Sequence, residues 1–329
     1  MSNDWPTALL ERFDTLRLVV LGDFLIDEFQ FGEISRVSRE APVLILHYQG
    51  TRICPGGAAN TVANVAALGA RVRPIGVVGD DPGADELAAL WPDNVDTSGL
   101  LREPSVRTTR KSRILAGSFH SFQQQVVRMD YETPVVRRPA WERRVLSGLA
   151  DVLEETDALV ISDYSLGNIT PRIKRDAMSA ASARGIPIII DSRDHPGAFP
   201  GATTVTPNIT EVEASLRRTI GQDQKKLERY GETARRKWRV EALLVTRGKL
   251  GMSLFTSSSV VHIEAHGSDE ALDVTGAGDT VAATYATSLA AGTDFESAAR
   301  LANVAAGLVV MKKGTSTVTR EELANAMAF

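Results

Sequence analysis

Residues Asp273 to Thr280, with the sequence Asp-Val-Thr-Gly-Ala-Gly-Asp-Thr, place a turn of small residues directly before an apolar run. The run from Thr280 to Ala291 predicts a helix. The first N–H groups of a helix have no partner inside it and lie at the positive end of its dipole, so such a turn can bind an anion, above all phosphate. The backbone groups available for this are those of Gly276, Ala277 and Gly278.

Asp279 is the unusual member of this turn, because a carboxylate repels a resting anion. Its presence is explained if it removes a proton from the group that attacks phosphorus, which makes Asp279 a candidate general base for phosphoryl transfer. The alternative is that Asp279 only caps the helix, as many acidic residues do, while Gly276 and Gly278 form a turn. This segment alone leaves both interpretations open.

The sequence disfavours two other nucleotide-binding loops. A Walker A loop needs Ser or Thr after its Gly-Lys pair, whereas Gly248-Lys249 is followed by Leu250. A dinucleotide fingerprint needs a third glycine after Gly276-Ala277-Gly278 and a strand before it, and the sequence has Asp279-Thr280-Val281 and a poor strand instead.

A second glycine motif, Gly56-Gly57-Ala58-Ala59-Asn60, opens a predicted helix that ends at Gly69. Asn60 falls in the first turn of this helix. Paired glycines allow a ligand to approach the backbone closely. The alternative is a tight turn in which the glycines serve packing only.

The elements that would position these residues alternate between strands and helices. Arg17 to Leu21 predicts a buried strand that ends at Gly22-Asp23, and Ala158 to Ile161 predicts another that ends at Ser162-Asp163-Tyr164. Further strands are predicted over residues 74–78, 186–190, 203–206 and 243–246, with a hairpin over 252–255 and 260–263. Helices are predicted over residues 58–69, 85–91, 145–154, 172–184, 280–291, 295–311 and 321–328. This alternation predicts an α/β fold with a mainly parallel central sheet and helices on both faces.

Two segments, at about residues 24–50 and 103–130, interrupt the alternation. The first has an irregular polar stretch over 24–40 and a predicted strand over 42–46, and the second alternates polar and apolar residues as half-exposed strands do. We expect both to pair as a small antiparallel sheet, a lid over the site, within a single domain of residues 1–329. Its cations would meet an anionic substrate or form a solvated face; they include Arg36, Lys111, Arg113 and Arg128.

The composition of the 329 residues is that of an ordinary globular protein, with 43% hydrophobic and 24% charged residues. The net charge of −4 gives no general affinity for nucleic acid or anionic membranes. The single cysteine, Cys54, excludes an internal disulfide and suits a reducing cytoplasm. No signal peptide and no membrane-spanning run is visible, so we expect a cytoplasmic protein.

Taken together and in this order, the motifs resemble those of the PfkB/ribokinase-type carbohydrate kinases over essentially the whole chain. The Gly56 to Asn60 motif is similar to the first signature of the family, and Asp273 to Thr280 to its highly specific second signature. Between them, Asn208-Ile209-Thr210-Glu211 resembles the family's N-x-x-E motif, and Thr246-Arg247-Gly248 its nucleotide-side loop. The resemblance implies a ribokinase-like fold.

Within the family, the chain most resembles the D-glycero-beta-D-manno-heptose 7-phosphate kinases of ADP-heptose synthesis. The stretches that carry this are 22–23, 27, 32, 35–38, 40–43, 124–130, 162–164 and 314–318. Those kinases are often fused to a nucleotidyltransferase domain, and since this chain ends at Phe329 we expect a stand-alone kinase. Two positions depart from the pattern: Leu166 replaces a lysine, and Asp191-Ser192-Arg193 replaces D-P-K. They put the sugar in doubt and leave the kinase chemistry untouched.

The resemblance implies the following roles. Asp279 would be the general base, and the N–H groups of Gly276, Ala277 and Gly278 would form an anion hole. Asn208 and Glu211 would hold Mg²⁺ mostly through water. A monovalent cation such as K⁺ would bind near Asp273, Thr275 and Ser316. The nucleotide would lie along Asn208, Glu211, Thr246, Arg247, Gly248, Gly276, Gly278 and Asn303. The substrate-binding residues would be Asp23, Asp27, Arg36, Gly56, Gly57, Asn60, Lys111, Arg113, Arg128, Asp163 and Arg193.

We therefore expect an ATP-dependent kinase of a sugar or sugar phosphate, with heptose 7-phosphate as the first choice. A kinase of another sugar or of a nucleoside is the alternative, although the cations of the lid favour a phosphorylated substrate. A nucleotide-binding regulator without catalysis would need neither Asp279 nor Glu211, and a dehydrogenase lacks its fingerprint. An exposed lid sheet with open edges favours a homodimer through the lid.

Overall fold

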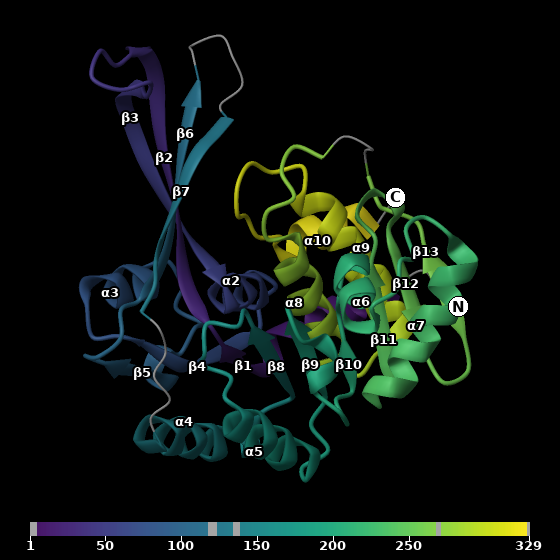
Figure 1. The fold of residues 1–329 in the computed structure, drawn as a ribbon. Coiled ribbons are helices and arrows are strands. Elements are labelled where there is room, and N and C mark those ends of the chain that lie inside the picture. The colour runs from purple at the N-terminus through teal and green to yellow at the C-terminus, as the bar shows by residue number, and fades with distance from the viewer. Residues whose placement is uncertain (1–4, 118–123, 134–138, 268–270, 328–329) are drawn as a thin grey trace.

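The computed structural model describes residues 5–117, 124–133, 139–267 and 271–327. Its main sheet has nine strands (Figure 1). The pairs β11–β12 and β12–β13 are antiparallel, and all other described neighbours in this sheet are parallel. In order across the sheet the strands are β13 (Val260–Ile263), β12 (Met252–Phe255), β11 (Ala242–Thr246), β10 (Thr204–Val205), β9 (Ile188–Ser192), β8 (Ala158–Asp163), β1 (Arg17–Gly22), β4 (Arg71–Gly79) and β5 (Leu100–Glu103).

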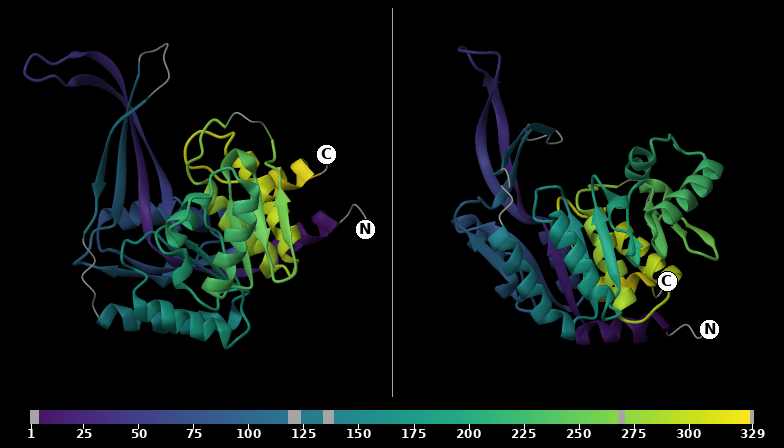
Figure 2. Two further views of the ribbon diagram at one scale, coloured as in Figure 1. Left: turned by 45° about the vertical axis from the view of Figure 1, so that its right-hand side comes forward. Right: turned by 60° about the horizontal axis from the view of Figure 1, so that its bottom comes forward.

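Helices cover both faces of this sheet (Figures 1 and 2), as the alternation of strands and helices predicts. Strand β1 shows the division, because Leu18 and Val20 join the core on one face while Val19 and Leu21 join the core on the other. The first face is covered by α1 (Trp5–Glu11), α2 (Ala58–Ala67), α3 (Pro82–Ala89), α8 (Ala277–Ala290), α9 (Phe295–Val309) and α10 (Arg320–Met327). The second is covered by α4 (Pro139–Val152), α5 (Pro171–Ser182), α6 (Ile209–Leu216) and α7 (Gln224–Trp238). Among the described helices, none has the length and hydropathy needed to span a bilayer.

A second, four-stranded sheet stands away from the main sheet (Figure 2). Its strand order is β3 (Leu44–Gly57), β2 (Phe24–Val37), β6 (Thr109–Gly117) and β7 (Gln124–Tyr131). Both hairpins, β2–β3 and β6–β7, are antiparallel as expected, but the central pair β2–β6 is parallel from Leu25 opposite Thr109 onward. The reason is that β2 directly follows β1 and β6 follows β5, so both hairpins leave the main sheet in the same direction.

The predicted elements differ from the observed ones in several places. Residues 24–40, expected to be irregular, contain the 14-residue strand β2, whose inner half is buried and whose outer half is exposed. Elements α1, α6, α7 and β5 were not predicted, and residues 100–103 belong to the main sheet. The expected lid residues 118–123 and the last expected helical residue, 328, lie outside the described part of the chain.

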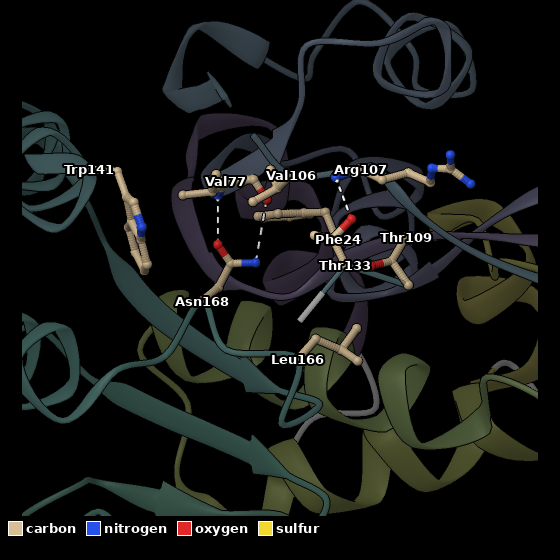
Figure 3. Close-up of a pocket in the computed structure, with 9 residues that line it drawn as sticks. All are labelled: Phe24, Val77, Val106, Arg107, Thr109, Thr133, Trp141, Leu166 and Asn168. Atoms are coloured by element: carbon tan, nitrogen blue, oxygen red, sulfur yellow. Dashed lines mark hydrogen bonds between the residues drawn. The ribbon is translucent and has the colours of Figure 1, made fainter. Parts of the chain in front are cut away.

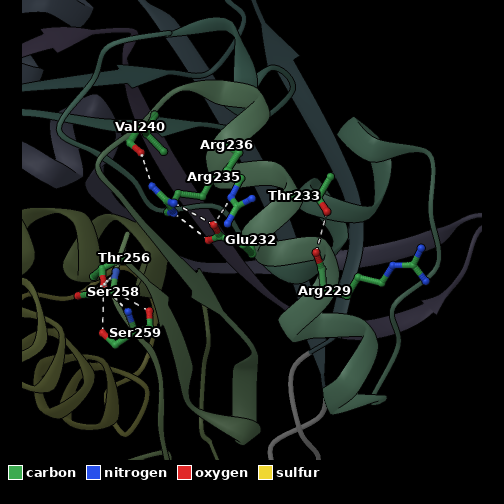
Figure 4. A network of polar contacts seen from close by, with 9 residues as sticks. All are labelled: Arg229, Glu232, Thr233, Arg235, Arg236, Val240, Thr256, Ser258 and Ser259. Atoms are coloured by element: carbon green, nitrogen blue, oxygen red, sulfur yellow. Dashed lines mark hydrogen bonds and ion pairs between the residues drawn. The ribbon is translucent and has the colours of Figure 1, made fainter.

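Helix α7 was missed because only Leu227, Gly231, Ala234 and Trp238 of its 15 residues are buried, in a strongly charged sequence. Away from these buried residues, Glu232 forms ion pairs with both Arg235 and Arg236 (Figure 4). Pairs at this spacing stabilise a helix by about 0.2–0.5 kcal/mol each. The predicted hairpin β12–β13 is observed, and its turn is closed by hydrogen bonds from Thr256 to Ser258 and Ser259.

Candidate active site

Asp279 lies in the first turn of α8, because the helix begins at Ala277 rather than at the expected Thr280. Gly276 precedes the helix with a left-handed backbone at φ 80°. A Cβ atom at Gly276 would lie 2.5 Å from the Nδ2 atom of Asn60, so only glycine fits between the helix and this amide. The turn therefore brings the backbone of residues 276–278 and the Asp279 carboxylate to one place.

Three side chains hold the Asp279 carboxylate, which is 4% exposed. Asn60 donates to its Oδ2 atom at 2.8 Å. The hydroxyl groups of Tyr164 and Thr61 donate to its Oδ1 atom at 2.8 and 3.4 Å. Asn60 and Thr61 belong to α2 and Tyr164 follows β8, so three elements distant in the sequence meet at Asp279. A helix cap needs no such set of partners, which favours a chemical role for Asp279.

The pKa of Asp279 is raised to about 6, first by burial and also by the nearby Asp27 carboxylate, against the hydrogen bonds from Asn60, Tyr164 and Thr61. At neutral pH the carboxylate is mostly ionised, yet it is far more basic than an exposed aspartate. A pKa close to the working pH suits a general base.

Asp23, expected to bind sugar hydroxyls, accepts hydrogen bonds from a loop of its own chain. The N–H groups of Tyr164 and Leu166 donate to Oδ2 at 2.9 and 3.1 Å, and that of Asn168 donates to Oδ1 at 3.0 Å. Burial raises the pKa of Asp23 to about 6 against these bonds. The carboxylate thus fixes the loop that carries Tyr164.

The far side of this loop lines a hollow at the foot of the second sheet (Figure 3). Leu166 lines this hollow together with Phe24 and Trp141. The Asn168 side chain bonds both the N–H and the carbonyl of Val77, at 2.8 and 3.4 Å, and so ties the loop to β4. The apolar Leu166 replaces a cation that the resemblance predicts at this position.

Gly56 and Gly57 end β3 beside Asp27 rather than forming a free loop. A Cβ atom at Gly56 would lie 2.5 Å from the Oδ2 atom of Asp27, and Gly57 has a positive φ of 56°. Asp27 is buried and pairs with Arg113 at 2.5 Å. The two glycines, Asp27 and Arg113 therefore form one group at the base of the second sheet.

The cations expected to bind a substrate phosphate do not converge on one point. Lys111 lies 3.9 Å from Glu132, and Arg128 pairs with Asp130 at 2.9 Å. Arg36 is exposed in the outer half of β2. Arg193 is the exception, because its guanidinium group lies over the Tyr164 ring at 5.1 Å from the centroid, next to the candidate base.

Asn208 and Glu211 form a capping box at the start of α6, in which each side chain accepts from the other residue's backbone N–H. The pKa of Glu211 is raised to about 7, first by burial. The pKa of the neighbouring Asp191 is raised well above its ordinary value by burial and by the charges of Asp279 and Glu211. A bound cation would relieve the repulsion that Asp279 and Glu211 exert on Asp191.

The other residues expected along the nucleotide lie at the neighbouring strand ends. Thr246 pairs with Asn208 in a β-bridge, and Gly248 has a positive φ of 58°. The Arg247 side chain donates to Ser253 at 3.3 Å, and Asn303 donates to the carbonyl of Glu264 at 2.8 Å. These two side chains thus hold strands and loops in place as well as bordering the expected nucleotide position.

The expected monovalent-cation residues lie around the loop that follows α9. Both carboxylate oxygens of Asp273 accept backbone N–H groups, from Thr275 and Gly314, each at 2.9 Å. Burial opposes ionisation, but these bonds and the charge of Arg52 outweigh it and lower the pKa of Asp273. Ser316 donates to the carbonyl of Lys313 at 3.3 Å.

Sequence reasoning missed Tyr164, Thr61, Asp191 and Arg52 as parts of this site. Tyr164 follows β8 and Asp191 lies near the end of β9, at the edge where ligands bind in parallel sheets, which is a signal that could have found them. Arg52 lies on β3 and reaches the carbonyl of Lys313 at 3.2 Å, a contact that no local pattern indicates.

Comparison with known proteins identifies the family that the sequence motifs resemble. The family model described as pfkB family carbohydrate kinase matches residues 16–322. The bifunctional protein HldE of Gluconobacter oxydans is 38% identical over 320 residues, covering 96% of this chain and 65% of that protein. The HldE of Alkalilimnicola ehrlichii is 40% identical over 320 residues, covering 97% and 65%. The chain thus spans about 65% of the length of the curated relatives it matches.

Solved structures show the same fold. A ribokinase from Arabidopsis thaliana, in complex with ribose and ATP, has a TM-score of 0.74 at 20% identity and covers 95% of this chain and 99% of its own. Phosphofructokinase-2 from Escherichia coli, in complex with potassium, has a TM-score of 0.75 at 17% identity, with coverage of 95% and 98%. The expected ribokinase-like fold is confirmed, and with the family match over most of its length, this chain belongs to the pfkB family of carbohydrate kinases.

Proposed function

We propose that this kinase uses ATP to phosphorylate D-glycero-D-manno-heptose 7-phosphate at O1, giving the 1,7-bisphosphate. The observation that carries the kinase chemistry is the buried Asp279 carboxylate, held by three donors beside an anion-binding turn. The choice of sugar is supported by the similarity to HldE proteins and by the motifs that match the heptose 7-phosphate kinases.

In this proposal Asp279 accepts the proton of the sugar hydroxyl as that oxygen attacks the transferred phosphoryl group. The backbone N–H groups of Gly276 and Gly278 would face the charge that develops on this group, whereas that of Ala277 donates to the carbonyl of Val274 at 3.3 Å in this structure. One such donor contributes roughly 10²–10³-fold in rate. Asn60 orients the base, and Gly56, Gly57 and Asp27 border the sugar at the foot of the second sheet, while Asp163 supports the Tyr164 loop.

Mg²⁺ would be held near Asn208 and Glu211 and would neutralise charge on the phosphates. The fit is supported by Asp191, whose pKa is raised first by burial and then by the charges of Asp279 and Glu211. In the described part of the chain, no three His, Cys, Asp or Glu side chains gather to form a direct cage. An ion that keeps most of its water shell matches such a site. K⁺ near Asp273, Thr275 and Ser316 is proposed on the resemblance to relatives.

Glu211→Gln is expected to raise the Mg²⁺ concentration that gives half-maximal activity, because an amide is a weaker partner than a carboxylate for a hydrated divalent ion. A Mg²⁺ titration of the ADP-release rate measures this. The matched control is Glu213→Gln on the same helix, where Glu213 accepts the N–H groups of Ile220 and Gly221. Identical Mg²⁺ curves for all three proteins would remove Glu211 from the metal site.

The substrate is expected to carry a phosphate before the reaction, with Arg113 as a principal contact among the cations of the second sheet. Arg113→Ala should lower kcat/KM for heptose 7-phosphate more than for free heptose, by roughly 10–150-fold, because a charge-assisted contact is worth about 1.5–3 kcal/mol. Kinetics on both sugars measure the ratio, and Arg229→Ala on the distant α7 is the control. Equal kcat/KM on both sugars for the wild type would disprove a phosphorylated substrate.

A coupled ADP-release screen against phosphorylated and free sugars and nucleosides tests the proposed function as a whole. Turnover of heptose 7-phosphate well above all other acceptors is the expected result. Preference for a nucleoside would support the alternative in which the same mechanism acts on another acceptor. Binding of ATP without turnover of any acceptor would indicate a regulator.

We further propose that two copies associate through the second sheet and that the protein works in the cytoplasm. The sheet exposes apolar side chains that are unusual on a free surface, among them Val37, Val43, Tyr48, Val126, Val127 and Met129. Its outer strands β3 and β7 have open edges, which favour pairing with another strand. Sedimentation of the wild type at several concentrations measures the association.

A further inference from the structure

We propose that the hydroxyl group of Tyr164 positions the Asp279 carboxylate together with Asn60, so that the orientation of the base depends also on a residue outside the two glycine motifs. This inference rests on the proposed role of Asp279 as general base. Tyr164 donates to Oδ1 at 2.8 Å, and Asn60 donates to Oδ2 at the same distance. With one short hydrogen bond on each oxygen, the plane of the carboxylate is fixed.

The two bonds leave room for the substrate. A carboxylate offers about two lone-pair positions on each oxygen. Oδ1 accepts from Tyr164 and Thr61, whereas Oδ2 accepts from Asn60 alone among the described residues, so Oδ2 can still accept a hydrogen bond from a sugar hydroxyl. A base fixed before the substrate arrives needs no reorganisation during the reaction, which is the advantage of a preorganised site.

Tyr164 itself is fixed at two points. Its backbone N–H donates to the buried Asp23 at 2.9 Å, and its ring lies beneath the guanidinium group of Arg193, 5.1 Å from the centroid. Arg193 is held in turn by its own N–H, which donates to the carbonyl of Asp163 at 3.1 Å. A phenol ring is rigid, so fixing the backbone and the ring also fixes the position of its hydroxyl group.

Tyr164 remains a donor at every working pH. Burial, followed by the charges of Asp279 and Asp191, raises its pKa well above the ordinary value. Burial and the charge of Asp27 favour the protonated form of Asp279. The hydrogen bonds from Tyr164, Asn60 and Thr61 favour the ionised form. Two further charged groups act on Tyr164 and Asp279. They are Asp191, whose pKa is affected by Asp279, and the guanidinium group of Arg193.

The test is Tyr164→Phe, which keeps the ring and removes the hydroxyl group. Without this donor the pKa of Asp279 rises, so the acid limb of the kcat/KM profile should move up by about one to two pH units. KM for ATP should change little. Thr61→Val is the matched control, because Thr61 donates to the same oxygen at 3.4 Å instead of 2.8 Å and its loss should move the limb much less.

A readout without turnover separates this inference from the proposed function. Carbon NMR of labelled aspartate follows the titration of the Asp279 carboxyl group, whose signal is the one lost in Asp279→Asn. A midpoint raised in Tyr164→Phe and little changed in Thr61→Val supports the inference even if no tested sugar is turned over. An unchanged or lowered midpoint in a Tyr164→Phe protein with wild-type thermal unfolding overturns it, as does an equal rise in both variants.

Discussion

Replacing Asp279 with asparagine is expected to lower kcat by roughly 10²–10⁴-fold, the usual contribution of a general base. Asparagine keeps the shape of the side chain but cannot accept the proton of the attacking hydroxyl. ATP affinity should persist, because removing a negative charge beside an anion-binding turn does not weaken phosphate binding. Steady-state kinetics and ATP titration by calorimetry measure the two quantities.

The control for this prediction is Asp176→Asn on α5, a half-buried aspartate that pairs with Arg172 and Arg175. It should keep both turnover and ATP affinity. If Asp279→Asn retains more than about a tenth of the wild-type kcat, Asp279 is not the base. Loss of ATP binding together with turnover would instead mean that the substitution damages the whole turn.

Replacing Asp23 with alanine is expected to lower both stability and turnover. The carboxylate is fully buried and accepts three backbone N–H groups from the loop at residues 164–168. A buried donor left without an acceptor costs about 1–3 kcal/mol, so the free energy of unfolding should fall by at least about 3 kcal/mol. Turnover should fall as well, because the same loop places Tyr164 against Asp279.

Denaturant unfolding with kinetics on the folded fraction measures both effects. Asp81→Ala is the control, since Asp81 also accepts backbone N–H groups, from Ala84 and Thr108, but lies near the surface as the cap of α3. Its loss should cost no more than about 2 kcal/mol. Equal unfolding free energies for the two variants would show that the Asp23 loop is not held by these bonds.

The sequence predicted the central sheet well because its strands are buried on both faces. Such strands appear as short apolar runs, and β1, β8 and β11 were found within one or two residues of their ends. The edge strand β5 and the charged helix α7 have no such runs and were missed. β2 was mistaken for an irregular segment, since its long hairpin is buried at the foot and exposed at the tip and so has no single periodicity.

At the site, the sequence identified residues that belong to the two glycine motifs. Asn60 and Asp279 were both named, and they are in contact. It did not identify Tyr164, although the residue follows a strand, because a tyrosine in that position is common and only the fold shows that its hydroxyl group reaches Asp279. It also could not show that Arg113 faces Asp27, since the partners of a long cation are set by strand register rather than by spacing.

The parallel pairing of β2 and β6 has a consequence for the order of folding. Each hairpin closes a short loop, whereas the ladder that sets Leu25 opposite Thr109 closes a loop that includes α2, β4, α3 and β5. Loop closure of this length costs more entropy than a hairpin turn, so the four-stranded sheet should form only after β1 and β4 have brought the feet of both hairpins together. The second sheet is thus assembled from two separate insertions, β2–β3 and β6–β7, and its central pairing needs both of them.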